Sequence, residues 1–576
     1  MASLLGLTGA IYVGSAGIPS LLDDADSFYA EVVREMALRH DWVTPYANGL
    51  RFFDKPPLFY WLISLSNAVF HAGNAFTARL PTALAVLALV FVTFKIGKLL
   101  WGFRVGLFGG LALATSAGMF LFTRIVLPDA LVTLLLTLFL YCFLLWERAE
   151  NKKPPLLWMY AFAALAVMAK GLIGLVFPLM ILLATLAATK RLKETARLLS
   201  LKGSLLFVAI AGPWHVLIGA RNHGFFWFYF INEHLLRFLG KRYPMDYGTV
   251  PLIPFWLLHL VWLFPWSIYL LALCRPSNFK RALAQNRRGL VLLLAWVFAI
   301  LIFFSFSSRL EYYTLPAMPA MALLAGMQCT SCWERGEKWP GITLAVLGAL
   351  CGAALIAVAA YASAATTESF LKLKDNPDLY VYYLGHLFDL TPESLLALRT
   401  PLVLAGIGLG VAFPLHHFFK RMGAKATVLA LGMGCFFVAA NLGFLIFAPR
   451  LTSRPVADEI NRRWDASSPA APAIVIDGEY EEASSVAFYT GRMVLIHHEP
   501  SSSLWYGSRY ADAPPMFLDD SQLKQLWNEP NSRVFLVTFQ PKLAQLENVI
   551  PQSKFVLSTY GDKLLLSNRP DVGVSP

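Results

Sequence analysis

Three carboxylates follow the first apolar run of the chain, in the stretch 22–26, which reads Leu-Asp-Asp-Ala-Asp. A single Asp before an amphipathic run is typical of a helix N-cap, and here it would cap a helix over residues 27–39. One carboxylate is enough for that purpose, whereas three beside an apolar segment are costly to place at a lipid surface. The pattern therefore indicates a general base or a cation site, with Asp24 and Asp26 as the candidate catalytic residues and Asp23 as their neighbour.

A second charged motif, Asp54-Lys55-Pro56-Pro57, precedes an aromatic apolar segment over Leu58–Phe70. Proline fixes its own φ and keeps the residue before it extended, so the charged pair is held at a rigid turn before a helix. The simple interpretation is an ordinary ion pair in a turn at the membrane interface. The alternative is that both side chains contact a substrate.

Two later segments carry similar chemistry. In Asn232–Phe238, Glu233 and Arg237 are four residues apart, which is typical of an ion pair on a helix surface. The functional interpretation is a cation cluster for a phosphate, with His234 as a metal ligand. Arg309 and Tyr313 stand where a later apolar run begins; an aromatic belt is expected there, and both could also face the same cavity.

The composition tells which elements must position these side chains. Of 576 residues, 57% are hydrophobic and 15% are charged, against about a quarter charged in soluble domains. A soluble enzyme and a disordered chain are therefore both excluded. The net charge of +12 does not indicate a nucleic-acid partner, because the basic residues fall in short loops between apolar runs. The fold class is an all-α polytopic membrane protein.

The apolar runs number thirteen, each approaching the length that crosses a bilayer. They are 2–22, 79–94, 105–122, 127–146, 155–169, 172–189, 203–220, 252–273, 289–305, 312–331, 341–363, 399–417 and 426–447. Residues 156–189 contain one charge, Lys170. As a single helix these 34 residues would extend about 51 Å, so we expect the chain to reverse at Lys170-Gly171.

The charge pattern of the loops predicts the orientation. Alternate loops carry 21 basic residues against five acidic ones, whereas the opposite turns carry single charges. The positive-inside rule then places the N-terminus in the cytoplasm and, after thirteen spans, the C-terminus outside. The outer pieces are residues 23–78, 221–251, 364–398 and the tail from 451.

The tail alternates short β-rich runs with polar helical stretches. The expected strands are Ala473–Asp477, Met493–His497, Arg533–Phe539, Lys554–Ser558 and Lys563–Leu566. We therefore predict a membrane domain over residues 1–450 and a small α/β domain over 451–576 on the outer side.

Topology brings the candidate residues together. They come from separate outer segments, yet all are expected at one membrane surface. A group of carboxylates and a group of cations there suit chemistry with a phosphate leaving group on a lipid-linked substrate. The set is Asp24, Asp26, Asp54, Lys55, Lys170, His234, Arg237, Arg309 and Tyr313.

At these motifs the chain resembles the GT-C membrane glycosyltransferases. Within them it is most similar to the branch that holds the aminoarabinose-to-lipid-A transferases and bacterial relatives of the protein O-mannosyltransferases. The motifs run in family order over residues 20–320. They are the acidic loop with Tyr29-Ala30-Glu31 and Arg34-Glu35-Met36, Asp54-Lys55-Pro56, Arg79-Leu80-Pro81, Lys170-Gly171, Glu233–Phe238, Phe264-Pro265-Trp266 and Tyr313-Thr314-Leu315-Pro316.

The resemblance implies transfer of a sugar from a polyprenyl-phosphate donor to an acceptor at the outer face of the bacterial inner membrane. The acceptor stays open among lipid A, a protein hydroxyl and a glycan. The family's loop commonly reads Asp-Glu, and this chain has Asp-Asp-Ala-Asp, so the base falls on Asp24 or Asp26. Where close relatives have Glu-Lys-Pro, this chain has Asp54-Lys55-Pro56.

The resemblance also implies the roles of the remaining residues. Lys55, Arg237 and Tyr313 would contact the donor phosphate. Asp54 and His234 would complete a site for a divalent metal (Zn, Mg or Mn). The alternative function is a transporter or flippase of a lipid-linked sugar, but transporters usually place their charges at mid-membrane on paired broken helices.

Overall fold

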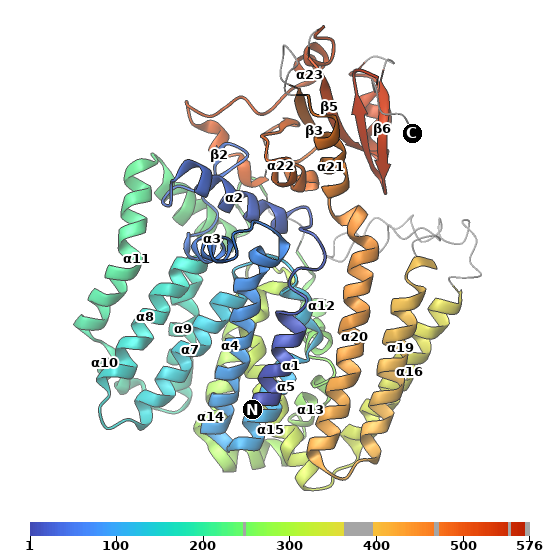
Figure 1. The fold of residues 1–576 in the computed structure, drawn as a ribbon. Helices are drawn as coiled ribbons and strands as arrows, with labels where there is room; N and C mark the ends of the chain where they lie inside the picture. The colour runs from blue at the N-terminus through green and yellow to red at the C-terminus, as the bar shows by residue number, and fades with distance from the viewer. Residues whose placement is uncertain are drawn as a thin grey trace.

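The computed structural model describes residues 1–245, 249–361, 396–465, 472–500, 502–530, 532–550 and 554–570. Upright helices form the larger part, and a small sheet domain sits on one end of them (Figure 1). The N-terminus lies toward the opposite end from that sheet. The expected outer loop 364–398 lies, apart from its last three residues, outside the described residues.

Apolar helices make up the membrane part. They are α1 (Ala2–Tyr12), α4 (Ala75–Trp101), α5 (Phe103–Ala114), α6 (Ala117–Phe122), α7 (Asp129–Arg148), α8 (Lys153–Lys170), α9 (Ile173–Ala188), α11 (Leu201–Arg221), α12 (Leu252–Trp262), α13 (Ser267–Ala272), α14 (Pro276–Ser305), α15 (Met318–Glu334), α16 (Trp339–Tyr361), α19 (Arg399–Phe418) and α20 (Met422–Leu451). Among the described residues, seven of these are long and apolar enough to cross a membrane by themselves.

Each expected apolar run contains helix, but some runs are interrupted. Run 105–122 divides into α5 and α6, and run 252–273 divides into α12 and α13. A hydrogen bond connects the two interruptions, because the Ala117 N–H donates to the Phe264 carbonyl at 3.2 Å. Helix α1 has 11 residues, about 16 Å at 1.5 Å per residue. The count of thirteen complete spans therefore stays a prediction.

The expected reversal at Lys170-Gly171 is confirmed. Helix α8 ends at Lys170, α9 begins at Ile173, and the two helices pack on each other. Gly171 has a φ of +87°. Side chains are disfavoured at such a φ, so glycine is the natural residue at this turn.

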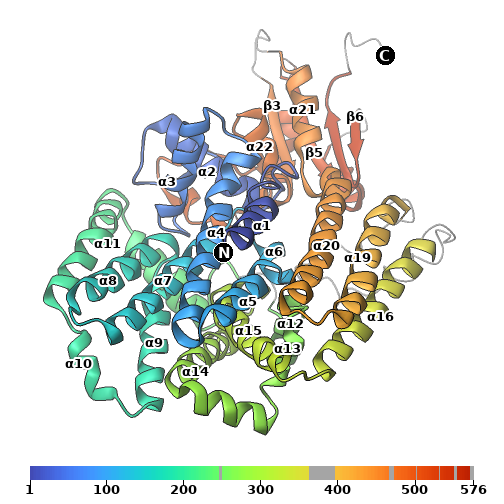
Figure 2. The same cartoon turned by 60° about the horizontal axis from the view of Figure 1, so that its bottom comes forward.

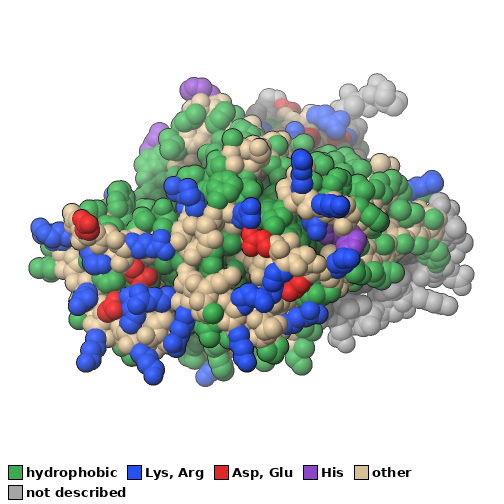
Figure 3. All heavy atoms as spheres, turned by 90° about the horizontal axis from the view of Figure 1, so that it is seen from below, with side chains coloured by type: hydrophobic (Ala, Val, Ile, Leu, Met, Phe, Trp, Pro, Cys, Tyr) green, Lys and Arg blue, Asp and Glu red, His purple; other side chains and the backbone are tan. Residues whose placement is uncertain are grey.

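Helices α16, α19 and α20 stand together at one side of the bundle, and the turned view agrees (Figures 1 and 2). Their contact is close because glycines face each other, as where Gly352 meets Gly406 and Gly410. Small residues of this kind let membrane helices approach. Seen from the end opposite the sheet, the surface carries many Lys and Arg side chains (Figure 3).

The first outer loop folds into ordered elements. They are helix α2 (Ala25–Arg39), the hairpin of β1 (Tyr46–Ala47) and β2 (Leu50–Arg51), and helix α3 (Leu58–Phe70). Helix α3 has the bounds that the sequence predicts. Helix α2 begins two residues earlier than expected, with Asp24 at its N-cap position and Asp26 inside its first turn.

The tail contains a five-stranded sheet, and each expected strand is present. The strands are β3 (Ala473–Asp477), β4 (Leu495–His497), β5 (Val534–Phe539), β6 (Phe555–Tyr560) and β7 (Lys563–Ser567), in the order β4-β3-β5-β7-β6. Strand β3 is parallel to β4 and β5, with Val475 opposite both Leu495 and Leu536, whereas β7 is antiparallel to β5 and β6.

Short helices complete the tail around this sheet. They are α21 (Arg454–Arg463), η6 (Tyr480–Ala483), α22 (Ser485–Thr490), η7 (Ser502–Leu504), η8 (Gly507–Arg509), α23 (Asp520–Trp527), η9 (Gln540–Lys542) and α24 (Leu543–Leu546). The division between domains after residue 450 stays a prediction.

Candidate functional site

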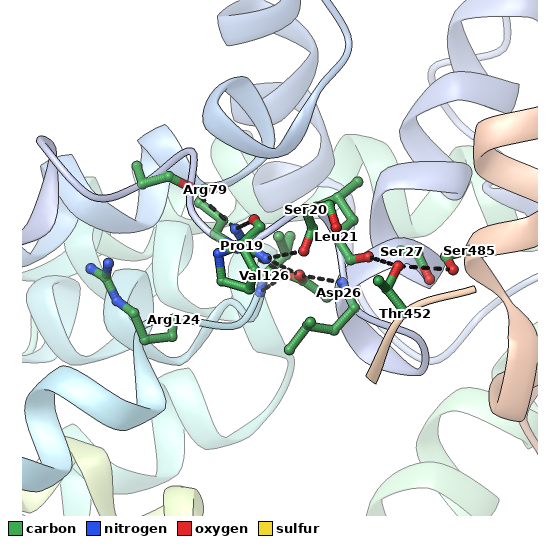
Figure 4. A network of polar contacts seen from close by, with 12 residues as sticks. Pro19, Ser20, Leu21, Asp26, Ser27, Arg79, Arg124, Val126, Thr452 and Ser485 are labelled. Carbon is green, nitrogen blue, oxygen red and sulfur yellow. Dashed lines mark hydrogen bonds and ion pairs between the residues drawn. The ribbon is translucent and has the colours of Figure 1, made fainter. Parts of the chain in front are cut away.

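The three Asp residues at the start of the first outer loop have different surroundings, and Asp26 is the most enclosed. Its side chain is fully buried and forms an ion pair with Arg79 of α4. It also accepts hydrogen bonds from the N–H groups of Leu22 at 2.9 Å and Val126 at 2.8 Å. The Arg79 guanidinium in turn donates to the carbonyl of Pro19 at 2.6 Å (Figure 4). Both carboxylate oxygens of Asp26 are thus engaged in holding three segments together.

Asp23 points toward the C-terminal domain. Its carboxylate is paired with Lys563 of β7 and accepts hydrogen bonds from the hydroxyls of Ser453 at 2.8 Å and Ser485 at 2.6 Å. The Ser485 N–H donates to the same carboxylate at 2.9 Å. Asp23 therefore joins the first outer loop to the C-terminal domain.

Asp24 differs from Asp23 and Asp26 in its exposure and in its backbone conformation. It is half-buried and its side chain makes no capping hydrogen bond to α2. Its φ of +65° lies in the left-handed region, which costs of order 1–3 kcal/mol for a residue with a Cβ. Such conformations persist only where the surrounding structure holds them, and they are frequent at functional sites.

Tyr29 of α2 shows that the acidic groups converge. Burial raises the pKa of its phenol well above the usual value, and the negative charges of Asp54, Asp129 and Asp24 raise it further. The phenol therefore lies within the field of three carboxylates from three segments. Asp54 and Asp24 are candidates from the sequence; Asp129 is not.

The Asp54-Lys55 turn lies against a π-helix, η2 (Trp227–Leu236). Glu233 of η2 binds Arg242 at 2.6 Å, and Arg242 lies 3.6 Å from the carboxylate of Asp54. Burial raises the pKa of Asp54, and the charge of Glu233 adds to this. Arg242 is a member of the site that the sequence analysis missed, since it lies beyond the motif around Glu233.

Glu233 also pairs with Arg237 at 2.8 Å, as the spacing of four residues predicts. Burial disfavours the ionised form of Glu233, but the charges of Arg237 and Arg242 outweigh it and lower its pKa. The pair is thus both the expected ion pair and part of a larger array.

Lys55 is buried among charges of both signs, with Asp54 and Glu233 opposing two nearby cations. Burial lowers its pKa to about 8, and the nearby charges of Arg237 and Lys170 contribute to the lowering. Its ammonium donates to the backbone carbonyl of Asp54 at 3.2 Å. We call Lys55, Lys170 and Arg237 the cation cluster.

Lys170, the member of the cation cluster at the end of α8, has two further neighbours. It pairs with Asp129 at the start of α7 and lies 4.9 Å from the ring centroid of Tyr313. The sequence signal for Asp129 was available: Pro128-Asp129 opens an apolar run. It was overlooked because a single acidic residue in the first turn of a helix is ordinary.

Several buried polar atoms beside the cation cluster have no hydrogen-bond partner among the described residues. They are Asp54 Oδ1, Asp129 Oδ2 and the hydroxyls of Tyr60 and Tyr229. Buried polar groups are normally paired, so unpaired atoms near one another are available to the polar groups of a ligand. Cations that attract a phosphate and oxygens that accept from sugar hydroxyls would serve such a ligand.

His234 and Arg309 have other partners. The Nδ1 of His234 lies 2.5 Å from the Tyr229 carbonyl, and its Nε2 accepts from the Leu172 N–H at 3.1 Å. Both ring nitrogens are engaged, so a metal held by Asp54 and His234 would have to displace one of these bonds. No group of three or more potential metal ligands occurs in the described part of the chain, and the metal site stays a prediction.

Arg309 donates to the carbonyls of Val250 at 2.6 Å and Ser305 at 3.3 Å. It thus holds the segment before α12. No contact in the described part of the chain links it to the cation cluster.

Comparison with known proteins shows which sequences and folds the chain is similar to. Residues 54–216 match the family model of the dolichyl-phosphate-mannose-protein mannosyltransferases. The chain is 30% identical over 371 residues to the undecaprenyl phosphate-alpha-4-amino-4-deoxy-L-arabinose arabinosyl transferase of Yersinia enterocolitica, covering 62% of this chain and 65% of that protein. The homologous enzyme of Pectobacterium carotovorum is 30% identical over 307 residues, with 51% and 53% covered. The alignments thus span between about half and two thirds of these relatives.

The fold extends over nearly the whole chain. The crystal structure of ArnT from Cupriavidus metallidurans bound to undecaprenyl phosphate superposes with a TM-score of 0.82 at 21% identity, covering 99% of this chain and 98% of that one. The archaeal oligosaccharyltransferase AglB from Archaeoglobus fulgidus gives a TM-score of 0.50 at 12% identity, with 95% and 71% covered. The chain is a multi-pass membrane protein with the GT-C fold, and parts of its sequence are similar to the aminoarabinose transferases and to the dolichyl-phosphate-mannose-protein mannosyltransferase family.

Proposed function

We propose that the chain is a glycosyltransferase that moves a sugar from a polyprenyl-phosphate donor to a hydroxyl group of an acceptor. The observation that carries the proposal is the cation cluster of Lys55, Lys170 and Arg237, placed beside buried carboxylates. Three cations in a site with little water suit a phosphate, and undecaprenyl phosphate is the ligand of the superposed structure from Cupriavidus metallidurans. The curated relatives carry undecaprenyl-phosphate aminoarabinose transferase names, so lipid A is the first acceptor to test, before a protein hydroxyl or a glycan.

The membrane orientation belongs to the same proposal. The chain is a multi-pass protein of the bacterial inner membrane. We place its N-terminus in the cytoplasm and its C-terminal domain in the periplasm. The Lys and Arg side chains gathered on the end opposite the sheet support this direction (Figure 3).

In the proposed reaction Asp24 is the general base. It removes the proton of the acceptor hydroxyl while that oxygen forms a bond to the anomeric carbon of the donor sugar. The bond between that carbon and the phosphate oxygen breaks, and the polyprenyl phosphate leaves with the electron pair. We assign the base to Asp24 rather than Asp26 because both oxygens of Asp26 are engaged with Arg79 and backbone N–H groups.

The cation cluster stabilises the negative charge that develops on the leaving phosphate. Lys55 has a pKa of about 8 without ligand, and a bound phosphate favours its charged form. The Tyr313 ring packs against Lys170 and keeps that ammonium within the cluster. Arg309 remains a candidate for substrate contact through the segment that it holds.

The test uses the full chain in proteoliposomes with a polyprenyl-phosphoryl aminosugar and lipid A, and measures the mass of the acceptor. Wild type is expected to add one sugar, whereas Asp24→Asn and Lys55→Met are expected to lose transfer. Asp458→Asn on the exposed face of α21 is the matched control and is expected to retain it. Relocation of the donor between leaflets without a covalent product would contradict the proposal and favour a flippase. So would wild-type turnover in both site variants.

A further inference from the structure

The C-terminal domain contacts the first outer loop next to the proposed base. Lys563 of β7 and Asp23 form an ion pair whose side chains are 3% and 9% exposed. Ser453 and Ser485 complete the surroundings of the Asp23 carboxylate. A charged group of the C-terminal domain is thus buried one residue away from Asp24.

The backbone N–H groups of Asp23 and Asp24 also bind to residues at the end of α20 and in the C-terminal domain. The N–H of Asp23 donates to the carbonyl of Leu451 at 2.8 Å, and the N–H of Asp24 donates to the carbonyl of Glu481 at 2.9 Å. Asp24 itself has the disfavoured φ of +65°. Such a conformation persists only where the surrounding structure holds it, and these contacts contribute to holding it.

Docking of the two domains does not by itself need this buried charge. Asn48 forms two hydrogen bonds of 2.8 Å with the backbone of Val494, and Arg51 binds Asp512 at 2.6 Å, both away from Asp24. A buried ion pair usually adds little stability compared with apolar residues of similar size. The pair therefore needs an explanation other than adhesion, and its position beside Asp24 supplies one.

We infer that the C-terminal domain sets the position of the catalytic base, with Asp23, Lys563 and Ser485 as positioning residues. They fix the backbone of Asp24 so that its carboxylate faces the acceptor hydroxyl. This inference rests on the proposed transferase function. It gives the C-terminal domain a part in the reaction that does not require it to touch either substrate.

The first test needs no activity. Hydrogen exchange of the full chain in detergent is compared between wild type, Lys563→Met and the double variant Asp23→Asn/Lys563→Met. The single variant leaves the Asp23 carboxylate buried without its cation and can therefore fail to fold. The double variant removes both charges, so that it can be measured in that case too. The amides of Asp23 and Asp24 are expected to exchange faster in both variants, while the amides of α2 and β5 keep their protection. Unchanged exchange at residues 23–24 would overturn the inference.

The second test separates positioning from stability through the kinetics. Lys554→Met, which removes an ion pair with Glu547 on the same sheet, is the matched control. The double variant is expected to lose about 10²-fold in kcat, the cost of a misplaced group in a site, with the KM for the polyprenyl-phosphoryl sugar unchanged. Lys563→Arg is expected to recover most of the rate, and Lys554→Met to behave as wild type.

The outcomes distinguish the two proposals. If wild type shows no transfer, the proposed function fails, and the exchange experiment still decides whether the C-terminal domain holds residues 23–24. If wild type is active and the double variant has a normal kcat per folded molecule, the positioning role is wrong.

Discussion

The Asp26–Arg79 network and the cation cluster contain the same kinds of side chain and both lie toward the end of the bundle that carries the sheet, yet their polar atoms are paired differently. In the network, Asp26 and Arg79 find all their partners within the chain. In the cluster, the charges of Arg237 and Lys170 help to lower the pKa of Lys55, and Asp54 and Asp129 each have a buried oxygen with no hydrogen-bond partner in the described part of the chain. A complete network serves folding, and an incomplete one serves a ligand. Variants of each should therefore fail in different assays.

The largest effect is expected from breaking the complete network. Arg79→Met leaves the Asp26 carboxylate buried without its cation, which costs about 3–5 kcal/mol. Thermal unfolding in detergent should show the loss, and binding of polyprenyl phosphate should persist in the folded fraction. A folded variant with normal Tm and lost transfer would place Asp26 in the reaction instead.

Lys55→Met tests the cation cluster, in which the pairing of polar atoms is incomplete. Removing one preorganised cation from a developing charge costs about 2.7–4 kcal/mol, or 10²–10³ in turnover. The Tm should change little, because the variant removes the cost of burying an ammonium and its repulsion from Arg237 and Lys170, and these offset the lost attraction to Asp54 and Glu233. A variant that loses stability in proportion to activity would show that Lys55 serves folding.

The pH dependence of polyprenyl-phosphate binding also tests the role of Lys55. Lys55 is charged below its pKa of about 8 and neutral above it, so the affinity for polyprenyl phosphate should fall as pH rises above 8, by up to about tenfold per unit. The Kd for polyprenyl phosphate alone is measured from pH 7 to 9.5. Lys55→Arg is the control, because arginine stays charged over this range and its Kd should be flat. A wild-type Kd that is equally flat would remove Lys55 from the phosphate site.

A smaller effect is expected at the contact between the C-terminal domain and Asp54. The Ser503 hydroxyl donates to Asp54 at 3.1 Å, and its loss should cost about 0.5–1.5 kcal/mol. Ser503→Ala is therefore expected to weaken donor binding several-fold. Ser508→Ala removes a hydroxyl that bonds to Trp505 in the same segment; equal losses in both variants would mean that the segment, rather than Asp54, is affected.

The smallest effect concerns a complete network within the sheet domain. His497 lies between Asp477 at 2.8 Å and Asp520 at 3.0 Å, and its hydrogen bond to Asp477 is the main cause of its raised pKa. A raised pKa gives stability that is fully present below the unfolded value of about 6.5 and lost as pH rises through the folded value. His497→Gln should therefore lower Tm at pH 5.5 and have little effect at pH 8.5.

Much of the architecture follows from local patterns. Apolar length predicts the helices, the single charge at Lys170 predicts the reversal between α8 and α9, and alternation predicts the five strands. The cation cluster was also predictable, since topology alone places Lys55, Lys170 and Arg237 at one surface. These features depend on composition and on the dimensions of the bilayer, which a sequence displays directly.

The partners of individual carboxylates were not predictable. Asp23, Asp24 and Asp26 are neighbours in sequence, but the side chains of Asp23 and Asp26 point to Lys563 and to Arg79, whereas Asp24 stands at the N-cap position of α2. These directions depend on the first turn of α2 and on packing between segments hundreds of residues apart. Arg242 and Ser503 were missed for the same reason, because each approaches Asp54 from a distant part of the chain.

Gly171 belongs both to the turn between α8 and α9 and to the contact of that turn with η2. A methyl group at this position would overlap the ring of His234 and the hydroxyl of Tyr229, and η2 carries both of these residues together with Glu233. The turn that reverses the chain in the membrane therefore also fixes how closely η2 approaches the end of α8. Even an alanine there would force a choice between an intact helical hairpin and the present spacing of η2 from Lys170, so variation at residue 171 is constrained by the fold and by the proposed chemistry at once.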